Sequence, residues 1–429
     1  MKKKSSSKLA DQLWTIGLTA AGTGLAAVIV NNLVSSEKKV KHHMPHRYAV
    51  EDEQFERSIG QLLGPPLVGG NRVERLTNGD EIFPAMLEAI ESAEVSITFE
   101  SFVFWRGEMT RRFAQALAAK AREGVAVHVL LDGVGCDCVK GADVRAMEAV
   151  GVEVRIYHMS NFALFNYRTH RKLLVVDGVV GFTGGVGVGD FWMGNADAED
   201  HWRDSHYRVE GPVVAQLQAA FNDNWMTTQG EVLDGEKYFP RLQEQGEQPC
   251  QLFKSSPQGG SESARLMFLL SIAAAQRRIR IGNAYFVPDD LTTQTLLDAC
   301  DRGVEVDVLL PGPFQDSRLV RRASRARWGK LLKRGVRIFE YQPTMYHVKC
   351  MIIDDCLTSV GSANFDNRSF RLNDEANLNI LDRDFALQEG EIFDEDLGRA
   401  REVTYEDWRR RPLLEKLSDH GAALFRSQL

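Results

Sequence analysis

Two short segments of the sequence carry a histidine, a lysine and an aspartate at the same spacing within an apolar run. The first reads THRKLLVVDG and the second reads YHVKCMIIDD. Their polar residues are His170, Lys172 and Asp177 in the first segment and His347, Lys349 and Asp354 in the second. Because side chains alternate between the two faces of a strand, each histidine shares a face with its lysine, and the aspartate points the other way. One such string arises easily by chance, but two in one chain, each followed by a glycine turn, indicate one site that uses both.

Two histidines beside two lysines suit a double displacement at phosphorus. One imidazole attacks the phosphorus, and the other protonates the leaving alkoxide and later takes a proton from the acceptor. The lysines neutralise the phosphoryl oxygens as negative charge develops. This chemistry needs no metal ion and no other cofactor, so we predict none. The turn after the second motif offers the hydroxyl of Ser362 and the amide of Asn364 to hold a phosphate oxygen.

Each histidine also needs an acceptor for its second ring nitrogen, which fixes the tautomer and stabilises the cation. A carboxylate follows each motif, Asp204 in WRDSHYRVEGP and Glu375 in LNDEANLNI. We predict that Asp204 is the partner of His170 and that Glu375 is the partner of His347; the alternative is that both are ordinary charges at strand ends. The motif aspartates lie on the far face of their strands and are predicted to bind turn amides.

Composition describes a soluble enzyme of 429 residues with an attached hydrophobic segment. The net charge is -7 and the pI is about 5.9, whereas a nucleic-acid-binding domain is usually basic. Six cysteines are scattered without the spacing of a disulfide framework or a zinc site, and we interpret them as ordinary thiols.

The elements that carry the two motifs occur twice in the same order. Strand and helix patterns alternate through residues 70–245 and again through 246–395, and the phrase R-x-G-V-x-V-x-V-L-L recurs in both with one residue missing in the second. We predict an α/β fold of two homologous halves, each a mixed and largely parallel sheet flanked by helices. A pseudo-twofold axis brings the two motifs to one cleft, and residues 396–429 form a helical C-terminal segment.

The N-terminal segment has the composition of a membrane-spanning helix. Residues 12–36 carry no charge, and residues 13–34 are long enough to cross a hydrocarbon core as a helix. We predict an uncleaved membrane anchor, with residues 35–69 as a linker; a cleaved signal peptide is the alternative. Lysines flank both ends, so the sequence does not decide the orientation.

Beyond the anchor, the chain resembles the phospholipase D superfamily, and within it the bacterial cardiolipin synthases. The superfamily signature H-x-K-x4-D occurs at both motifs, and the phrases AYFVPDD, RIFEYQPTMYHVK, GSANFDNRSFRLNDEANLNI and DLGRAREVTYEDWRRRPLLEKL resemble that branch. The resemblance covers residues 70–429. It implies transfer of a phosphatidyl group from one phosphatidylglycerol to another, giving cardiolipin and glycerol, with His170 as nucleophile and His347 as acid and base.

One position departs from the family pattern. Asn364 lies as far beyond His347 as Gly187 lies beyond His170, and the family usually has asparagine at both places. The first half therefore offers only backbone N–H groups, at Gly185 and Gly187, for the phosphate. This leaves open whether the acceptor is a lipid alcohol or water.

A basic run within residues 317–337 stands out in this acidic chain. Its arginines alternate with apolar residues, a mixture that suits contact with an anionic lipid surface. We predict that Arg321, Arg322, Arg325 and Arg327 touch the membrane; a solvated helix face and a nucleic-acid site are the alternatives. Three functions remain: a phosphatidyltransferase, a phosphodiesterase acting on phospholipid or nucleic acid, and a membrane scaffold without catalysis.

Overall fold

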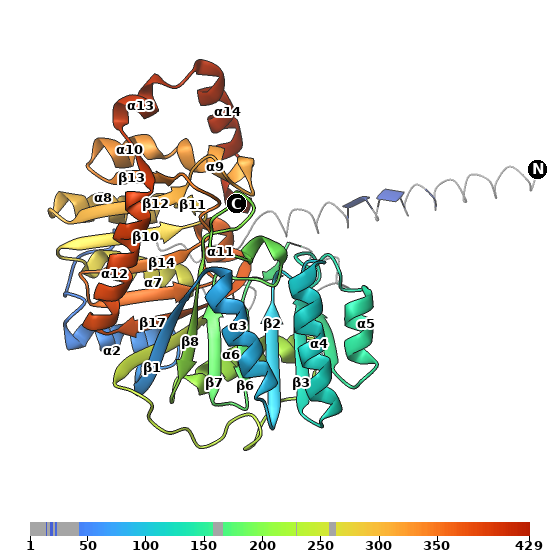
Figure 1. The fold of residues 1–429 in the computed structure, drawn as a ribbon. Helices are drawn as coiled ribbons and strands as arrows, with labels where there is room; N and C mark the ends of the chain where they lie inside the picture. The colour runs from blue at the N-terminus through green and yellow to red at the C-terminus, as the bar shows by residue number, and fades with distance from the viewer. Residues whose placement is uncertain are drawn as a thin grey trace, which may run out of the picture.

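The computed structural model describes residues 43–157, 166–228, 230–256 and 263–429, together with residues 14, 18, 19, 22 and 23. A sixteen-stranded sheet runs through both halves, and the halves meet where β1 pairs with β9 (Figure 1). Outward from this seam, the first half contributes β1 (Val68–Thr77), β8 (Ser205–Glu210), β7 (Val180–Gly184), β6 (Lys172–Val176), β2 (Ser96–Ser101), β3 (Ala126–Asp132) and β4 (Glu153–Tyr157). The second half contributes β9 (Gln248–Ser255), β17 (Asn373–Leu381), β15 (Leu357–Gly361), β14 (Lys349–Ile353), β10 (Arg278–Asn283), β12 (Glu305–Pro311), β13 (Arg337–Tyr341) and then β18 (Ala400–Val403).

This order is the same in both halves except for β18, which only the second half has, as the predicted duplication requires. The sheet is mixed, but it is less parallel than we expected. Among the fifteen strands in this order, only β2, β3 and β4, and likewise β10, β12 and β13, run parallel to one another. The strands nearer the seam are antiparallel, because each motif strand returns through a tight hairpin to its neighbour.

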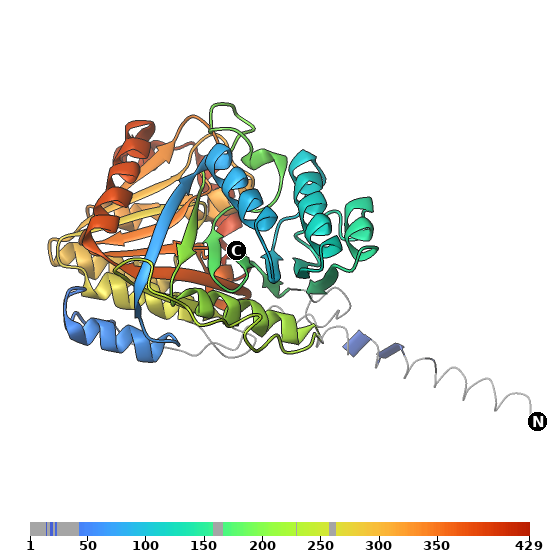
Figure 2. The same ribbon diagram turned by 60° about the horizontal axis from the view of Figure 1, so that its bottom comes forward.

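Three hydrophobic cores hold helices against this sheet. The first packs α3 (Asn78–Glu91), α4 (Glu108–Arg122) and α5 (Ala142–Glu148) against the first half, and the second packs α7 (Ser263–Ala274), α8 (Asp290–Asp301) and α10 (Trp328–Lys333) against the second. The third joins α6 (Val214–Thr227) and α12 (Arg383–Gly398) to strands of both halves. Figure 2 shows the strands passing through the middle of the molecule. Because the third core crosses the seam, the two halves form one packed body.

Equivalent glycines explain the phrase that recurs in the two halves. Gly124 follows α4 with φ of 93°, and Gly303 follows α8 with φ of 89°. A residue in this left-handed conformation ends a helix and is usually glycine, since a Cβ atom is disfavoured there. Each turn feeds directly into a buried parallel strand, β3 or β12.

The predicted linker is wrong in part, because residues 53–62 form a helix, α2 (Glu53–Leu62). Phe55 and Ile59 of this helix are buried in the second core, and His46 Nδ1 lies 2.8 Å from the carbonyl oxygen of Ala273. The amphipathic spacing of these residues is the signal that could have revealed the helix. The predicted anchor at 13–34 lies outside the described residues apart from the few isolated positions. Of the helices that the structure describes, none has both the length and the apolar character needed to cross a bilayer.

Candidate active site

The two motif segments meet across the seam of the sheet. Each lysine begins its strand, Lys172 in β6 and Lys349 in β14, and each histidine lies two residues earlier. The backbone N–H of His170 donates to the carbonyl oxygen of Asp374 at 2.8 Å, and that of His347 donates to Arg203 at 2.7 Å. The short strand β5 (Arg168–Thr169) pairs with β17 of the other half in the same way. The backbone of each histidine is therefore hydrogen-bonded to the half of the protein that does not contain that histidine.

This exchange overturns the predicted pairing of histidines and carboxylates. His170 Nδ1 lies 2.9 Å from Glu375 Oε2, and His347 Nδ1 lies 2.7 Å from Asp204 Oδ2. The prediction assigned each carboxylate to the histidine of its own half, and the structure pairs them across the seam. The physical reason is that the residue beside each carboxylate accepts the backbone N–H of the opposite histidine.

The histidines are built for attack through Nε2. With Nδ1–H donated to a carboxylate, Nε2 keeps its lone pair and is available to substrate. Each histidine is only 8% exposed. Burial lowers the pKa of His170 to about 4, although Glu375 opposes this shift. Burial and the nearby charge of Lys349 also lower the pKa of His347, against the pull of Asp204. Both imidazoles are therefore neutral in the unliganded site at pH 7, as a nucleophile must be.

The lysines lie where the prediction placed them, beside their histidines. Lys172 Nζ donates to the carbonyl oxygen of His170 at 2.7 Å, and Lys349 Nζ donates to that of His347 at 2.6 Å. Burial lowers the pKa of Lys172 to about 7, with repulsion from Lys349 as the second cause. Burial lowers the pKa of Lys349 as well. Two poorly solvated ammonium groups so close together favour an anion between them, and a phosphodiester has the required charge.

The motif aspartates bind backbone amides away from this chemistry, as predicted. Asp177 accepts hydrogen bonds from the N–H groups of Glu94, Val95 and Ser96 at 2.7–2.9 Å. Asp354 does the same for Gln276, Arg277 and Arg278 at 2.7–2.8 Å. Both aspartates have positive φ, 52° and 54°, at the hairpin turn that follows the motif strand. They fix the register of the motif hairpins against β2 and β10, and their effect on the histidines is indirect.

The turns after the two motifs differ in what they offer a phosphate. Ser362 donates its hydroxyl to Glu375 Oε2 at 2.5 Å, so it supports the carboxylate that holds His170. The Oδ1 atom of Asn364 is buried and has no hydrogen-bond partner among the described residues, which leaves this side chain free to bind a ligand. In the first half, a Cβ atom at Gly185 would lie 2.2 Å from Asp204 Oδ1, and one at Gly187 would lie 2.5 Å from Val103 Cβ. Both glycines are therefore required by close packing.

Sequence reasoning missed the side chains that complete the shell around the histidines. Ser369 donates to Glu375 Oε1 at 2.7 Å, and the Trp192 indole N–H donates to Asp204 Oδ2 at 3.0 Å. Phe102 stands edge-on to His170 at a centroid distance of 5.0 Å, and Trp202 lies 5.3 Å from His347. These residues lie outside the two H-x-K-x4-D strings, so their contacts with the histidines and carboxylates are identified by the fold.

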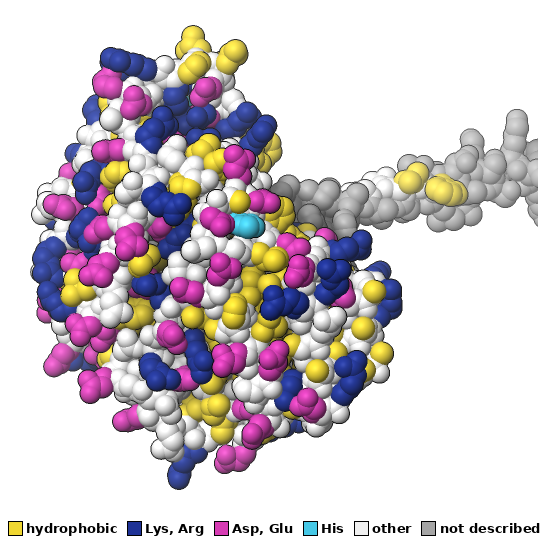
Figure 3. Space-filling view, viewed as in Figure 1, with side chains coloured by type: hydrophobic (Ala, Val, Ile, Leu, Met, Phe, Trp, Pro, Cys, Tyr) yellow, Lys and Arg dark blue, Asp and Glu magenta, His cyan; other side chains and the backbone are white. Residues whose placement is uncertain are grey.

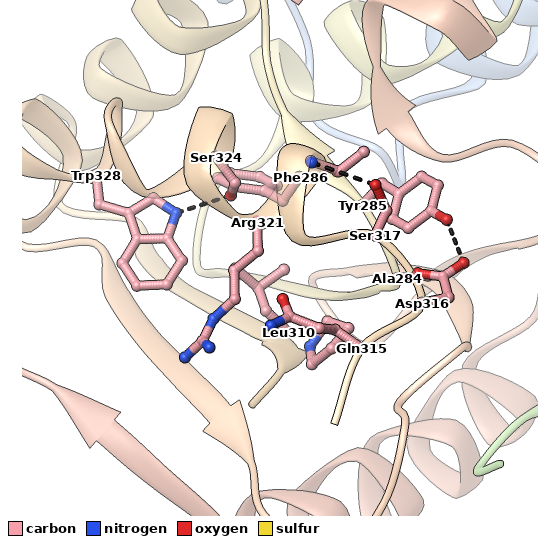
Figure 4. A pocket seen from close by; sticks show the side chains of 12 residues that line it. Ala284, Tyr285, Phe286, Leu310, Gln315, Asp316, Ser317, Arg321, Ser324 and Trp328 are labelled. Atoms are coloured by element: carbon pink, nitrogen blue, oxygen red, sulfur yellow. Dashed lines mark hydrogen bonds between the residues drawn. The ribbon is translucent and has the colours of Figure 1, made fainter. Parts of the chain in front are cut away.

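A small cavity adjoins the second half of the site (Figure 4). It lies between residues 284–286, which follow β10, the end of β12 and α9 (Arg318–Arg325), and the Tyr285 hydroxyl donates to Asp316 at its edge. Its volume is about 20 Å³, which admits a water molecule but no lipid headgroup. The charge of Asp316 nevertheless reaches His347 and Lys349, whose pKa values it raises against the dominant effect of burial.

The four arginines predicted to touch the membrane are mostly committed to the fold. Arg321 pairs with Glu340 at 2.7 Å, Arg325 with Asp419 at 2.9 Å, and Arg327 pairs with Asp290. Only Arg322 of the four is exposed. The basic membrane face predicted on α9 therefore has three of its four charges neutralised within the fold, because a run of arginines in the sequence does not reveal the carboxylates that pair with it.

Comparison with known proteins agrees with this geometry. A family model described as "Cardiolipin synthase, PLD-like domain" matches residues 86–225 and 269–397. Cardiolipin synthase A of Pseudomonas fluorescens is 36% identical over 373 residues, which cover 86% of this chain and 77% of that protein. Cardiolipin synthase A of Pseudomonas syringae is also 36% identical, over 378 residues, with the same coverage of both chains.

Solved structures support the fold. Phosphatidylserine synthase of Haemophilus influenzae superposes with a TM-score of 0.69 over 88% of this chain and 100% of its own, at 13% identity. At this identity the likeness shows the fold alone, whereas the family match and the curated relatives cover most of the sequence. The chain therefore belongs to the cardiolipin synthase family of phospholipase D-like proteins.

Proposed function

We propose that this chain is a cardiolipin synthase that transfers a phosphatidyl group between two phosphatidylglycerol molecules. The observation that carries the proposal is the crossed pair of hydrogen bonds, His170 to Glu375 and His347 to Asp204, with both lysines in the same buried site. Two oriented imidazoles allow one covalent step and its reversal with a different alcohol. The substrate is an anionic phospholipid, and no nucleic acid is involved.

In the first step, His170 Nε2 attacks the phosphorus of the donor lipid. The bond from phosphorus to the headgroup glycerol breaks, and the imidazolium of His347 gives its proton to the departing alkoxide. The phosphodiester anion raises the pKa of His347 on binding, and Asp204 stabilises the protonated ring. The product of this step is glycerol, with the phosphatidyl group held on His170 through an N–P bond.

In the second step, the acceptor lipid takes the place of glycerol. Neutral His347 removes a proton from the terminal hydroxyl of a second phosphatidylglycerol, and the oxygen attacks phosphorus. The N–P bond breaks, so His170 returns to its neutral form and His347 to its protonated form. Lys172 and Lys349 balance the charge on the phosphoryl oxygens in both steps, and Asn364 offers a further polar contact.

The N-terminal segment completes the proposal. Residues 13–34 hold the enzyme in the inner membrane as a single uncleaved anchor, where both lipid substrates lie. Residues 1–42 precede the first continuously described residue, which is long enough for a span and a short tether.

The test is to incubate the purified full chain with phosphatidylglycerol and to identify the products. We expect cardiolipin and glycerol in equal amounts, and neither product from His170→Ala. Phosphatidic acid and glycerol would instead identify a hydrolase, the alternative that Gly187 left open. Absence of any turnover, with the fold intact by circular dichroism, would overturn both.

A further inference from the structure

The helix α14 (Leu413–Ala423) presents an apolar face that no described residue covers. Five large side chains are exposed there: Leu413 at 76%, Leu414 at 80%, Leu417 at 69%, Leu424 at 82% and Phe425 at 59%. At 100° per residue, Leu413, Leu414 and Leu417 fall within one third of the helix circumference, and Leu424 and Phe425 follow directly after the helix. Figure 3 shows hydrophobic side chains gathered at this end of the molecule, where Figure 1 places α14.

The opposite face of α14 is firmly attached to the protein. Asp419 is fully buried and accepts two hydrogen bonds from Arg325 at 2.9 Å, and Arg411 also pairs with it. Ala422 is buried against α9 and β11 (Phe286–Val287). The bidentate ion pair fixes the rotation of the helix. The leucines therefore point outward because of how the helix is anchored.

Basic residues surround this apolar face. Arg409 and Arg410 of α13 (Tyr405–Arg410) are exposed just before it, and they share one carboxylate, Glu406, at 2.9 and 3.8 Å, which leaves a net positive charge. Beyond α13, the exposed Lys330 and Lys333 help to line a cavity of about 360 Å³. An exposed apolar helix face bordered by lysine and arginine is typical of a helix that lies in the interface of an anionic membrane.

The chain beyond α14 leads directly to the catalytic site. The 3₁₀ helix η4 (Arg426–Gln428) follows, and the carbonyl oxygen of Arg426 accepts from Asn367 Nδ2 at 3.0 Å. Asn367 begins α11 (Asn367–Arg371), which also contains Ser369, the hydroxyl donor to Glu375. The apolar face is thus separated from the shell of His170 by only one short helix and its contacts.

We propose that the apolar face of α14 docks the catalytic body on an anionic phospholipid bilayer. The proposal rests on the proposed function, since a substrate with two acyl chains needs a site held at the lipid surface. A second copy of the chain is the other natural occupant. It fits less well, because a twofold contact would bring the basic borders of two copies together, whereas an anionic bilayer neutralises them.

The test uses the full chain and the double variant Leu414→Glu/Leu417→Glu. The matched control is Val232→Glu/Leu387→Glu, which places two carboxylates at other exposed apolar positions, 59% and 44% exposed. Amide hydrogen exchange of α14 is measured with phosphatidylglycerol vesicles and with phosphatidylcholine vesicles. Transfer rates are measured on vesicles and on a short-chain phosphatidylglycerol below its micelle concentration.

We expect phosphatidylglycerol vesicles to protect the α14 amides in the natural chain and in the control. The double variant should lose this protection, and its rate on vesicles should fall at least ~10-fold, because two carboxylates replace two leucines that docking would bury in the bilayer. Its rate on the dispersed short-chain lipid should stay within ~2-fold of the natural chain, since neither leucine touches the site.

Several outcomes would overturn the proposal. An equal loss of rate on both substrates would assign α14 to the fold or the site. Protection of α14 before lipid is added would show that a second copy or the N-terminal segment covers it, and sedimentation would tell these apart. If α14 is protected by vesicles while no lipid is turned over in any form, docking stands and the proposed function fails.

Discussion

The two carboxylates that orient the histidines are held in different surroundings. Glu375 accepts hydrogen bonds from the hydroxyls of Ser362 and Ser369 at 2.5 and 2.7 Å, in addition to the imidazole. Asp204 has no hydroxyl partner among the described residues, and Gly185 stands where the second half has Ser362. Its other contacts are an indole N–H and the backbone N–H of Ser205 at 2.8 Å.

This difference bears on which histidine does what. Each strong donor to a carboxylate spreads its charge and makes it a weaker base. Glu375 is therefore suited to hold His170 neutral for attack, whereas Asp204 retains more basicity and better supports a protonated His347. The comparison favours His170 as the nucleophile and His347 as the acid and base. The two similar halves thus give the two histidines of one active site chemically different surroundings.

Replacing each histidine in turn tests the two assigned roles and should give the largest effects. His170→Ala should abolish both turnover and the covalent intermediate, because His170 carries the phosphatidyl group in the proposed mechanism. His347→Asn should lower both steps by roughly 10²-fold to 10⁴-fold through loss of acid and base assistance. Mass spectrometry of the quenched enzyme should find the phosphatidyl group on His170. A phosphatidyl group on His347 would reverse the two roles.

The crossed pairing is tested by Glu375→Gln and Asp204→Asn. Each variant should lower kcat by roughly 10²-fold or more, because the amide no longer fixes the tautomer or stabilises the cation. Histidine NMR should show that Glu375→Gln shifts the resonances and pKa of His170, and that Asp204→Asn shifts those of His347. The opposite pattern would restore the pairing within each half that the sequence predicts.

The lysines make the site sensitive to alkaline pH. Since the pKa of Lys172 is lowered to about 7, this side chain is charged below that pH and neutral above it. We expect kcat/KM to fall as pH rises through this range, approaching ~10-fold per pH unit, because the free enzyme loses the charge that binds the phosphodiester. A profile that stays level up to pH 9 would show that substrate binding does not depend on this proton.

Ser362→Ala should have the smallest effect on activity, and it tests directly whether the hydroxyl donors of Glu375 distinguish it from Asp204. Loss of one hydroxyl donor should make Glu375 more basic, raise the pKa of His170 and slow the first step by about tenfold or less. The matching change in the first half, Gly185→Ala, should instead reduce stability and expression, since its Cβ atom would lie 2.2 Å from Asp204 Oδ1. Thermal unfolding alongside pre-steady-state kinetics separates the two results. An equal effect of both variants on stability would mean that the turns are not specialised.

The repeated motif allowed the chemistry and the twofold fold to be predicted from the sequence. His170, Lys172, His347 and Lys349 carry their own spacing, and the alternation of a strand is enough to place them on one face. The partners of the histidines could not be predicted in the same way. Which carboxylate meets which histidine depends on contacts between residues far apart in the chain, 205 residues for His170 and Glu375 and 143 for His347 and Asp204, and no local pattern encodes them.

The basic run on α9 teaches the same lesson about charge. A cluster of arginines is unusual in this acidic chain, but the charge of Arg325 is neutralised by Asp419, which lies nearly a hundred residues later in the sequence. The sequence shows leucines and charged residues in the segment that forms α14. Only the buried position of Asp419 in the structure shows that the leucines face outward. Side-chain type alone therefore indicates a membrane surface less well than the partner that orients the helix.

The exchange of contacts across the seam also has a consequence for synthesis. A nascent chain that has emerged only through the first half contains His170 without its acceptor and without Lys349. The site appears only when β17 docks beside β5, a late event because it joins distant parts of the polypeptide. The nascent chain therefore has no complete active site, and cannot act on membrane lipid, until its second half has been synthesised and has folded.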